Sequence, residues 1–461
     1  MADIPQAGAA VAERFADWAT GLDGTAVPDD LRTVMESLLL DVVGLCVAAR
    51  HSDYVAATMA SCIAEGPCTA IGHARGLDAY GAALVNGTAI HGEDYDDTFE
   101  GTPVHAGAAI VPAVLAAGQA RAIDGERLLA GMAVGSELAC RLALVAPTAM
   151  HRAGFHPTAI IGALGATAGV CTALGLDSAR FAAALGIAGS FASGIIEYLS
   201  EGAWTKRVHP GWAAQAGIRA ALMAEAGFLG PRTVIEGPHG FFFAFAEPSI
   251  ARDFDKLTVD LGTHWHAQSM AFKVFACGTM CQPFIDCALR LRREGVTPER
   301  IRAIHCTVGE GTVHRLWEPM SEKIAPSTSY AAKFSVPYCI AVAFADGAAG
   351  LEQFSDRRTT DAAIRDLAAR VGYEIDPDDE YPRNYTGYLR VTLDVGSVVE
   401  ARQPHLRGGR HEPLGREDIV AKMRANLAYG GWSPERTAAV EAFAAGLFGS
   451  AGIAGLASLG E

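Results

Sequence analysis

The stretch PTAIIGALGATAGVCTALGLD, residues 157–177, decides the fold class of this chain. Its apolar side chains recur at helical spacing, and its small residues, among them Gly162, Gly165 and Gly169, let neighbouring helices approach closely. No strand precedes these glycines, so they do not form a dinucleotide-binding fingerprint. The stretch comes close to a membrane span in length and hydrophobicity. Its glycine and alanine content and its end at Asp177 instead predict a helix buried in protein.

Segments on both sides of this helix share its pattern. Apolar residues at helical spacing predict further helices over residues 31–49, 77–91, 107–122, 125–144, 178–193 and 210–226. Asp177-Ser178 is a helix start signal, and the glycines at positions 175 and 227 are helix stop signals. The first half of the chain therefore predicts an all-helical domain.

The pattern changes after residue 295. Alternating and β-branched residues predict strands at 301–308, 388–395 and 398–402, of which the last two form a hairpin. Helices are expected at 336–345, 360–371, 416–428 and 433–448. We therefore predict a mainly α fold, a large all-helical domain with an inserted smaller α+β lid domain. The helical domain is expected to span residues 1–268, completed by 403–461, and the lid to span 269–402.

Composition and charge narrow the class of function. Half of the 461 residues are hydrophobic, 19% are charged and the formal net charge is −15, which excludes the basic surface that nucleic-acid binding requires. The basic cluster from Arg290 to Arg293 is interpreted as one exposed face of a helix. The first residues show no signal-peptide pattern, and the ten cysteines are scattered in apolar runs. We expect a cytoplasmic protein with buried thiols, and neither a membrane nor a nucleic-acid partner.

The densest polar segment is HGEDYDDTFE, residues 91–100, which is followed by His105. Its acidic side chains repel one another unless they are solvated or paired, so the segment is either an acidic surface loop or part of a site. An EF-hand is excluded, because the loop lacks the glycine at its sixth position and the glutamate at its twelfth.

Three further segments place histidine or lysine at helix starts or among apolar residues. His156 begins the glycine-rich helix, Lys206 and Arg207 precede another predicted helix together with His209, and Lys273 stands between apolar residues. A helix N-terminus attracts carboxylates, and an adjacent lysine strengthens that attraction. Each segment alone also fits a structural role, as a satisfied histidine, a solvated basic turn or a lysine at the edge of the core.

Metal ligation is not indicated by the spacing of the candidate ligands. His264 and His266 form a possible pair, but no acidic or cysteine partner stands at metalloenzyme spacing. Cys277 and Cys281, with Cys287 further along, match no common iron–sulfur cluster spacing. We therefore expect no metal and no organic cofactor.

Taken in order, these segments resemble the MmgE/PrpD family, which includes 2-methylcitrate dehydratases, cis-aconitate decarboxylases and an iminodisuccinate epimerase. The likeness spans nearly the whole chain, and its clearest elements are residues 86–105, Phe155-His-Pro, Thr205-Lys-Arg-Val-His-Pro-Gly, Phe272-Lys273 and Phe334-Ser-Val-Pro-Tyr338. The resemblance implies a helical domain with an α+β lid, a homodimer, and a site in the cleft between the two domains.

The resemblance also implies which residues act on the substrate, a small anionic polycarboxylate. The implied catalytic residues are Asp94, His105, His156, Lys206 and Lys273. The implied substrate-binding residues are Thr98 and Tyr338, and Tyr338 would close the site from the lid. We also expect Arg207 and Gln282 to bind the substrate.

The chain departs from the family pattern in two places. The usual His-Pro-Ser is His105-Ala-Gly107 here, and one extra residue separates Thr98 from His105. Many members carry a histidine shortly after the lysine that corresponds to Lys273. This chain has no histidine between Lys273 and Gln282. These departures favour a substrate or a step different from those of the best-known members.

The chemistry that these residues suit is proton transfer next to a carboxylate. Removing such a proton builds a second negative charge, which fixed cations such as Lys206 and Lys273 stabilise. His105 and His156 form the predicted acid–base pair, and Asp94 orients an imidazole or acts as the acid. We favour a 2-methylcitrate-dehydratase-like hydro-lyase. The alternatives are a cis-aconitate-decarboxylase-like carboxy-lyase, an epimerase or isomerase of a dicarboxylate, and a binding protein without activity.

Overall fold

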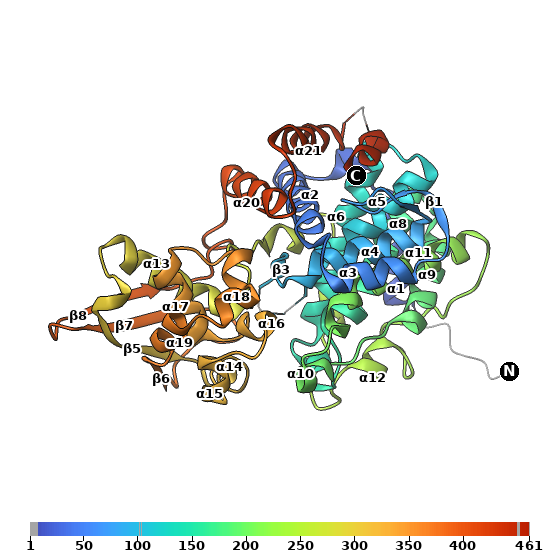
Figure 1. Cartoon of the computed structure of the whole chain (residues 1–461). Coiled ribbons are helices and arrows are strands. Elements are labelled where there is room, and N and C mark those ends of the chain that lie inside the picture. Colours follow the sequence, from blue (N-terminus) through green and yellow to red (C-terminus); the bar gives the residue numbers. More distant parts are fainter. Residues whose placement is uncertain (1–7, 101, 103, 450–451, 461) are drawn as a thin grey trace. The chain divides into compact units, whose positions relative to one another are not determined.

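The computed structural model describes residues 8–100, 102, 104–449 and 452–460 (Figure 1). The chain divides into two compact units. The helical unit comprises residues 1–92, 102–268 and 432–461, and the mixed unit comprises residues 93–101 and 269–431. Helices account for 58% of the residues and strands for 9%, which confirms the mainly α fold with a small sheet in the C-terminal region.

The helical unit contains thirteen α-helices and one short hairpin-like pair of strands among its described residues. The helices are α1 (Val11–Ala19), α2 (Asp29–Ala49), α3 (Asp53–Ser61), α4 (Ala79–Gly92), α5 (Ala106–Arg121), α6 (Gly125–Val145), α7 (Ala149–Arg152), α8 (Pro157–Leu174), α9 (Ser178–Phe191), α10 (Tyr198–Glu201), α11 (Thr205–Glu225), α12 (Phe241–Phe245) and α21 (Pro434–Gly446). The strands are β1 (Glu65–Thr69) and β2 (Gly76–Leu77), which pair antiparallel.

The glycine-rich helix α8 lies at the centre of this unit, packed against α5, α6, α9 and α11. Its contact with α6 is made between backbones. A Cβ atom on Gly135 of α6 would lie 2.7 Å from the carbonyl oxygen of Gly165, and one on Gly131 would lie 2.6 Å from that of Gly169. Because real Cβ contacts are never this short, the small residues are required where the two helices cross, as the sequence predicts.

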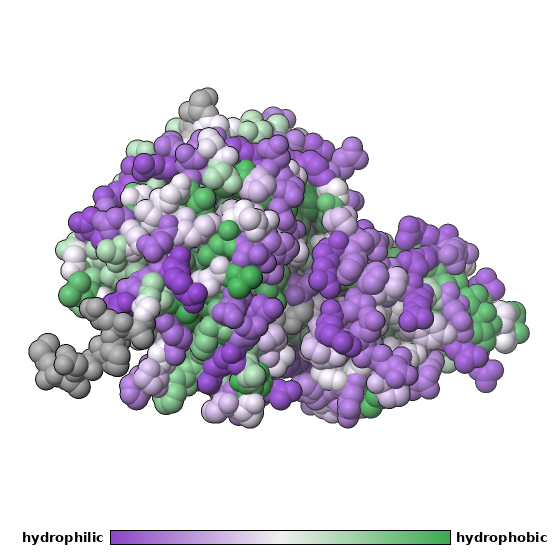
Figure 2. Space-filling model, turned by 180° about the vertical axis from the view of Figure 1, so that it is seen from behind, coloured by the Kyte–Doolittle hydropathy of each residue, from purple (hydrophilic) through white to green (hydrophobic). Residues whose placement is uncertain are grey.

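Helices α6 and α8 are both long and apolar enough to cross a membrane by length and composition alone. In each helix, 94% of the most apolar stretch of 18 residues is buried inside the structure, as expected for a helix in a protein core. Hydrophobic residues on the face shown in Figure 2 are interspersed with hydrophilic ones. We therefore interpret both helices as parts of a protein core, which agrees with the interpretation of residues 157–177 from the sequence.

One helix begins earlier than its sequence pattern predicts. The sequence predicts a helix that begins at Pro210, yet α11 begins at Thr205 and includes Pro210 in its interior. A proline is tolerated there at the loss of one main-chain hydrogen bond. Lys206 and His209 therefore belong to the first two turns of α11 instead of preceding it.

The mixed unit is built around a four-stranded sheet. The strands of the four-stranded sheet are β5 (Ile301–Val308), β6 (Val371–Ile375), β7 (Gly387–Leu393) and β8 (Val398–Gln403), and β3 (Thr98–Phe99) and β4 (Met270–Ala271) form a separate antiparallel pair. The helices of the mixed unit are α13 (Gln282–Arg293), α14 (Glu310–Leu316), α15 (Met320–Ile324), α16 (Ser329–Ala332), α17 (Val336–Asp346), α18 (Asp356–Thr359), α19 (Ala362–Ala368) and α20 (Arg416–Tyr429).

The sheet has the order β6-β5-β7-β8, in which β5 and β6 are parallel and the other neighbours are antiparallel. Helix α13 packs on β7 and β8, and α17 packs on α13. The predicted strands β5, β7 and β8 are confirmed, including the hairpin, whose turn contains Gly396 at φ 85°. The expected helix over 360–371 is wrong at its end. Helix α19 ends at Ala368, and Val371 begins β6, because pairing with β5 overrides the local helical pattern.

Two segments group differently from the predicted domain boundaries. Residues 93–101 and 403–431 fall in the mixed unit, whereas the sequence pattern predicts both in the helical domain. Two contacts explain this grouping. Strand β3 in the acidic segment pairs with β4, and Lys422 of α20 donates to the main-chain oxygen of Tyr95 over 2.7 Å.

Candidate active site

Four histidines of the helical unit gather at helix ends. His91 lies in the last turn of α4, His105 and His156 are the N-cap residues of α5 and α8, and His209 lies near the start of α11. All four are buried. Their ring centroids are 4.9 Å apart for His91 and His105, 5.4 Å for His91 and His156, and 5.3 Å for His156 and His209. We call this group the histidine cluster.

The main chain fixes the positions of these rings. The N–H of His156 donates to the carbonyl oxygen of Gly194 over 2.9 Å, and the N–H of His105 donates to the Thr158 hydroxyl over 3.1 Å. Gly194 has φ +132°, and a Cβ atom there would lie 2.5 Å from the Cβ of Ala159 and 3.3 Å from Nδ1 of His209. Only glycine adopts this conformation readily and leaves room for both neighbours.

His156 and His209 share a hydrogen bond between their Nδ1 atoms, which lie 3.1 Å apart. Such a bond needs one protonated and one bare Nδ1, so the two rings take opposite tautomers, or one ring is doubly protonated. Tyr198 of α10 packs edge-on against both rings, with centroids 6.0 Å from His156 and 5.8 Å from His209. The proton state of each ring is therefore tied to that of the other.

Burial keeps these two imidazoles neutral. Desolvation lowers the pKa of His156 well below its usual value, and neighbouring His91 and Lys206 lower the pKa further. The same causes lower the pKa of His209 to about 4. His156 also lies at the N-terminus of α8, where the helix dipole disfavours a positive charge. At neutral pH both rings are thus bases, ready to accept a proton when a negative charge arrives.

Lys206 lies close enough to His156 and His209 to depress the pKa of both. It is buried in the first turn of α11. Arg207, the next residue, stacks its guanidinium over the ring of Tyr54, 4.2 Å from the centroid. Lys206 is therefore part of the histidine cluster, and the substrate-binding role of Arg207 stays a prediction.

The charge beside His156 and His209 favours an anion over a metal ion at those two rings. Imidazoles are common metal ligands, but the Lys206 ammonium repels a cation placed among them. Helices α5 and α8 begin at His105 and His156, and the N-terminus of a helix favours a negative charge. The arrangement suits binding a carboxylate and moving a proton to or from a carbon beside it.

A second group of predicted residues meets in the mixed unit. The buried Lys273 ammonium donates to a side-chain oxygen of Asp94 over 2.7 Å and to its main-chain oxygen over 2.9 Å. A carboxylate oxygen of Asp96 lies 3.6 Å away. Asp94 has φ +55°, in the left-handed region, where aspartate is found more often than most other non-glycine residues. We call Asp94, Asp96 and Lys273 the carboxylate–lysine cluster.

Two residues beside this cluster were missed by the sequence analysis. The Tyr330 hydroxyl lies 3.4 Å from the second side-chain oxygen of Asp94. Lys333 pairs with the Glu93 carboxylate and with its main-chain oxygen, both over 2.8 Å. Nothing in the local pattern distinguishes Tyr330 from Tyr338, because the contact depends on how α16 and the acidic segment pack.

The remaining predicted residues are engaged elsewhere in the mixed unit. Tyr338 is fully buried, and its hydroxyl donates to the main-chain oxygen of Gln353 over 2.7 Å. The Gln282 carboxamide accepts from the N–H of Phe275 and donates to its carbonyl oxygen, which fixes the loop after Lys273. Thr98 lies in β3, paired with Ala271 of β4. Substrate contacts by these three residues stay predictions, and the hydrogen bonds of Gln282 favour a positioning role.

Two protein-family models match most of the sequence of this chain. The MmgE/PrpD N-terminal domain matches residues 13–252, and the MmgE/PrpD C-terminal domain matches residues 275–443. The chain belongs to the MmgE/PrpD family. The resemblance inferred from the ordered motifs is confirmed.

Several proteins that are similar to this chain are named cis-aconitate decarboxylases. A cis-aconitate decarboxylase of Aspergillus terreus is 28% identical over 442 residues, covering 90% of this chain and 88% of the relative. Cis-aconitate decarboxylases of Mus musculus and Homo sapiens are 30% and 29% identical, covering 75% of this chain and 71% and 72% of the relatives. Family and relatives together support a lyase.

Proposed function

We propose that this chain is a carboxy-lyase that removes CO₂ from a small unsaturated polycarboxylate of the cis-aconitate type. The observation that carries the proposal is the buried pair of His156 and His209 beside Lys206. The names of its relatives favour the carboxy-lyase alternative over the hydro-lyase that we preferred from sequence motifs alone. The hydro-lyase preference rested on how common that activity is in the family, which is weaker support than similarity over most of the chain.

Decarboxylation of such a substrate needs a proton and a place for negative charge. The bond between the carboxylate carbon and its neighbour breaks, and CO₂ leaves. The released electron pair forms a new double bond, and the carbon at the far end of the original double bond takes up one proton. Electrostatic stabilisation of the developing charge is usually the largest catalytic contribution.

The histidine cluster can supply that proton once substrate is bound. A polycarboxylate near Lys206 brings negative charge, which raises the pKa of adjacent imidazoles that are neutral in the free protein. His156 or His105 then takes up a proton and passes it to carbon. General acid catalysis of this kind contributes roughly 10²–10⁴-fold to rate. His209 holds His156 through the Nδ1 bond and acts as a positioning residue.

The carboxylate–lysine cluster has a different role in this proposal. The ammonium of Lys273 is already paired with Asp94 in the free protein, so its charge is partly neutralised. We infer that Asp94 and Lys273 act together, with Asp94 holding the ammonium in place while a substrate carboxylate competes for it. Both clusters are required for turnover in this proposal.

Incubation with cis-aconitate in D₂O, followed by proton NMR and CO₂ measurement, tests the proposal. A carboxy-lyase releases CO₂ and places one deuterium on one carbon of the product. A parallel incubation with 2-methylcitrate tests for water loss, and incubation with aspartate-like acids tests for deuterium exchange alone. The absence of CO₂ release from cis-aconitate would contradict the proposal. His156→Asn should be inactive, whereas His239→Asn, at an exposed histidine of the same unit, should retain activity.

A further inference from the structure

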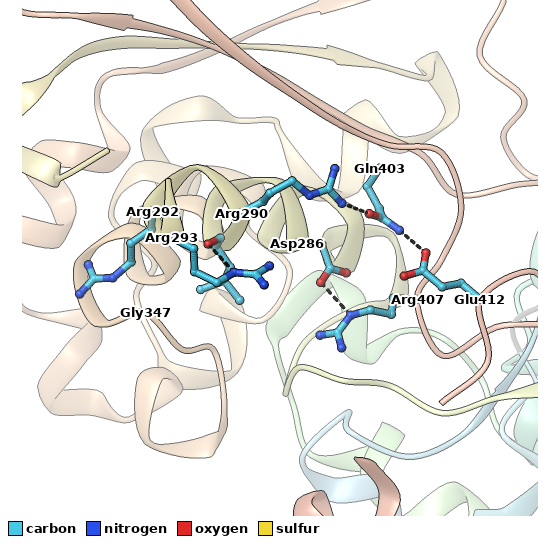
Figure 3. A pocket seen from close by; sticks show the side chains of 9 residues that line it. Asp286, Arg290, Arg292, Arg293, Gly347, Gln403, Arg407 and Glu412 are labelled. Atoms are coloured by element: carbon cyan, nitrogen blue, oxygen red, sulfur yellow. Dashed lines mark hydrogen bonds and ion pairs between the residues drawn. The ribbon is translucent and has the colours of Figure 1, made fainter. Parts of the chain in front are cut away.

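A pocket of about 540 Å³ opens in the mixed unit beside the last turns of α13 (Figure 3). Its volume lies within the roughly 300–1,000 Å³ typical of small-molecule sites. Four arginines and two carboxylates contribute to its lining, namely Arg290, Arg292, Arg293, Arg407, Asp286 and Glu412. In a chain of formal net charge −15, this concentration of guanidinium groups forms a local positive surface. We call it the arginine pocket.

Two of these arginines have structural partners. Arg290 donates to the main-chain oxygen of Arg402 over 2.9 Å and to the side-chain oxygen of Gln403 over 2.7 Å. Arg292 donates to the carbonyl oxygens of Phe344 and Ala345, at the end of α17. Figure 3 shows Arg292 extending away from the others toward Gly347. These two side chains join neighbouring elements, and their structural contacts explain their presence.

The other two arginines keep donors available. Arg293 is exposed, and its Nε donates to the carbonyl oxygen of Leu289 over 3.2 Å. The Nε of Arg407 donates to Asp286 over 2.9 Å. Within the described part of the chain, the terminal guanidinium nitrogens of both residues have no hydrogen-bond partner. Two planar guanidinium forks of this kind match the oxygens of a carboxylate or a phosphate.

Asp286 adds an unsatisfied acceptor to the same pocket. Its exposed fraction is 7%, one carboxylate oxygen accepts from Arg407, and the other has no hydrogen-bond partner among the described residues. Burial raises the pKa of this carboxyl, against the effect of Arg407. A buried acceptor without a partner is costly, and a hydrogen-bond donor on a ligand would satisfy it.

We propose that the arginine pocket binds a small polyanion that also carries a hydroxyl or amino donor, with its anionic groups on Arg293 and Arg407 and its donor on Asp286. The last turn of α13 presents carbonyl groups, so the guanidinium groups provide the attraction and the helix dipole does not. A fully deprotonated anion without a donor would face the Asp286 carboxylate unfavourably. The pocket therefore selects for a hydroxycarboxylate or a phosphate ester bearing hydroxyl groups.

Isothermal titration of the full chain with three probes tests this proposal. Citrate carries three carboxylates and a hydroxyl, tricarballylate is the same tricarboxylate without the hydroxyl, and ATP offers phosphates with ribose hydroxyls. We expect citrate or ATP to bind, and whichever of the two binds more tightly identifies the anion source. If the source is carboxylate, citrate should bind several-fold more tightly than tricarballylate. Arg293→Gln should weaken that binding by about tenfold, the loss of one charged fork.

Two further variants make the result specific. Asp286→Asn should remove the preference for citrate over tricarballylate while leaving the Arg407 contact possible. Arg357→Gln, an exposed arginine of α18, makes the same chemical change outside the pocket and should alter nothing. Arg407→Gln is avoided as the main test, because it leaves Asp286 buried without its cation. Equal binding by wild type and Arg293→Gln, or no binding of any probe, would overturn the proposal. Because the readout is binding changed by Arg293, a failed decarboxylase assay would not affect it.

Discussion

The Nδ1 atoms of His156 and His209 lie 3.1 Å apart in a site where both residues are buried. One ring must donate and the other must accept, so neither can change its proton without affecting its neighbour. His156 caps α8, the central helix of its unit, and His209 belongs to α11. The relationship joins two segments that are far apart in the sequence, and under the proposed function it makes His209 a positioning residue for the proton donor His156.

The first prediction concerns His209. His209→Phe removes the Nδ1 partner of His156 and should lower kcat/KM by roughly 10–100-fold, whereas His209→Gln, whose carboxamide can still hydrogen-bond, should retain most of the activity. The His209→Phe enzyme should also show a displaced pH profile, because the pKa of His156 no longer depends on a second ring. Steady-state kinetics across pH measures both effects. A purely structural role would lower the amount of folded enzyme and leave the pH profile unchanged.

The second prediction concerns stability against acid. The pKa of His209 is about 4 in the folded chain and about 6.5 when unfolded, so below pH 6.5 the unfolded state binds more protons. Its contribution to stability is fully present above pH 6.5 and is lost as the pH falls toward 4, up to about 3 kcal/mol. Denaturant unfolding at pH 7.5 and 5.0 measures the loss.

His209→Gln is the control for this loss, and it should reduce the difference in unfolding free energy between the two pH values. Part of the difference should remain, because burial also lowers the pKa of His156 well below its usual value and lowers that of His266 to about 4, both in the same unit. An unchanged difference in the variant would show that His209 is not the group that titrates.

The third prediction concerns proton uptake on binding. If a polycarboxylate raises the pKa of neutral imidazoles in the histidine cluster, binding at pH 7 takes protons from the buffer. Calorimetric titration with tricarballylate in two buffers of different ionisation enthalpy measures the number of protons, and the Arg293→Gln background limits the contribution of the arginine pocket. We expect a positive uptake in that background and less when His156→Asn is added. Equal binding enthalpies in the two buffers would contradict this coupling.

The fourth prediction concerns the ion pair of Asp94 and Lys273. Lys273→Met leaves a buried carboxylate without its cation and should destabilise the chain by about 3–5 kcal/mol. The double variant Asp94→Asn, Lys273→Met should be less destabilised than Lys273→Met alone, and both should be inactive. Unfolding free energies and turnover of the three proteins decide this. Full activity in the double variant would remove the pair from the mechanism.

The fifth prediction tests the crossing of α6 and α8. A Cβ on Gly135 would lie 2.7 Å from a backbone oxygen, which cannot move without shifting a helix. Gly135→Ala should therefore destabilise by about 1–3 kcal/mol. Gly154→Ala, at a glycine with open space around it but φ +90°, gives a comparison in which backbone strain acts without a clash. Denaturant unfolding of both variants measures the two effects. If Gly135→Ala lowers the unfolding midpoint less than Gly154→Ala does, close packing at the crossing of α6 and α8 would be contradicted.

Much of the fold could be predicted because local patterns agree with tertiary packing. The predicted segment 125–144 is α6 with one residue added, and the predicted strand 301–308 matches β5. The structure differs from the sequence-based predictions where contacts between residues far apart in the sequence determine the local structure. Val371 begins a strand because β5 lies beside it, and residues 403–431 group with the mixed unit because α20 packs there.

The candidate site was predictable in part. Motifs singled out His105, His156 and Lys206, which the structure brings into one cluster, and Asp94 with Lys273, which form an ion pair. His209 stood in a quoted motif, but its bond to His156 depends on the crossing of two helices. Tyr330 carried no signal, because its contact with Asp94 arises from packing of segments far apart in the sequence.

The backbone contact between α6 and α8 has a consequence for His156. Where helices meet through glycines, there are few side-chain rotamers whose rearrangement would let one helix slide along the other. The imidazole at the N-terminus of α8 therefore belongs to a helix that backbone contacts hold in place. The entropic cost of orienting this ring is part of the free energy of folding. The activation free energy of the reaction therefore contains less of that cost.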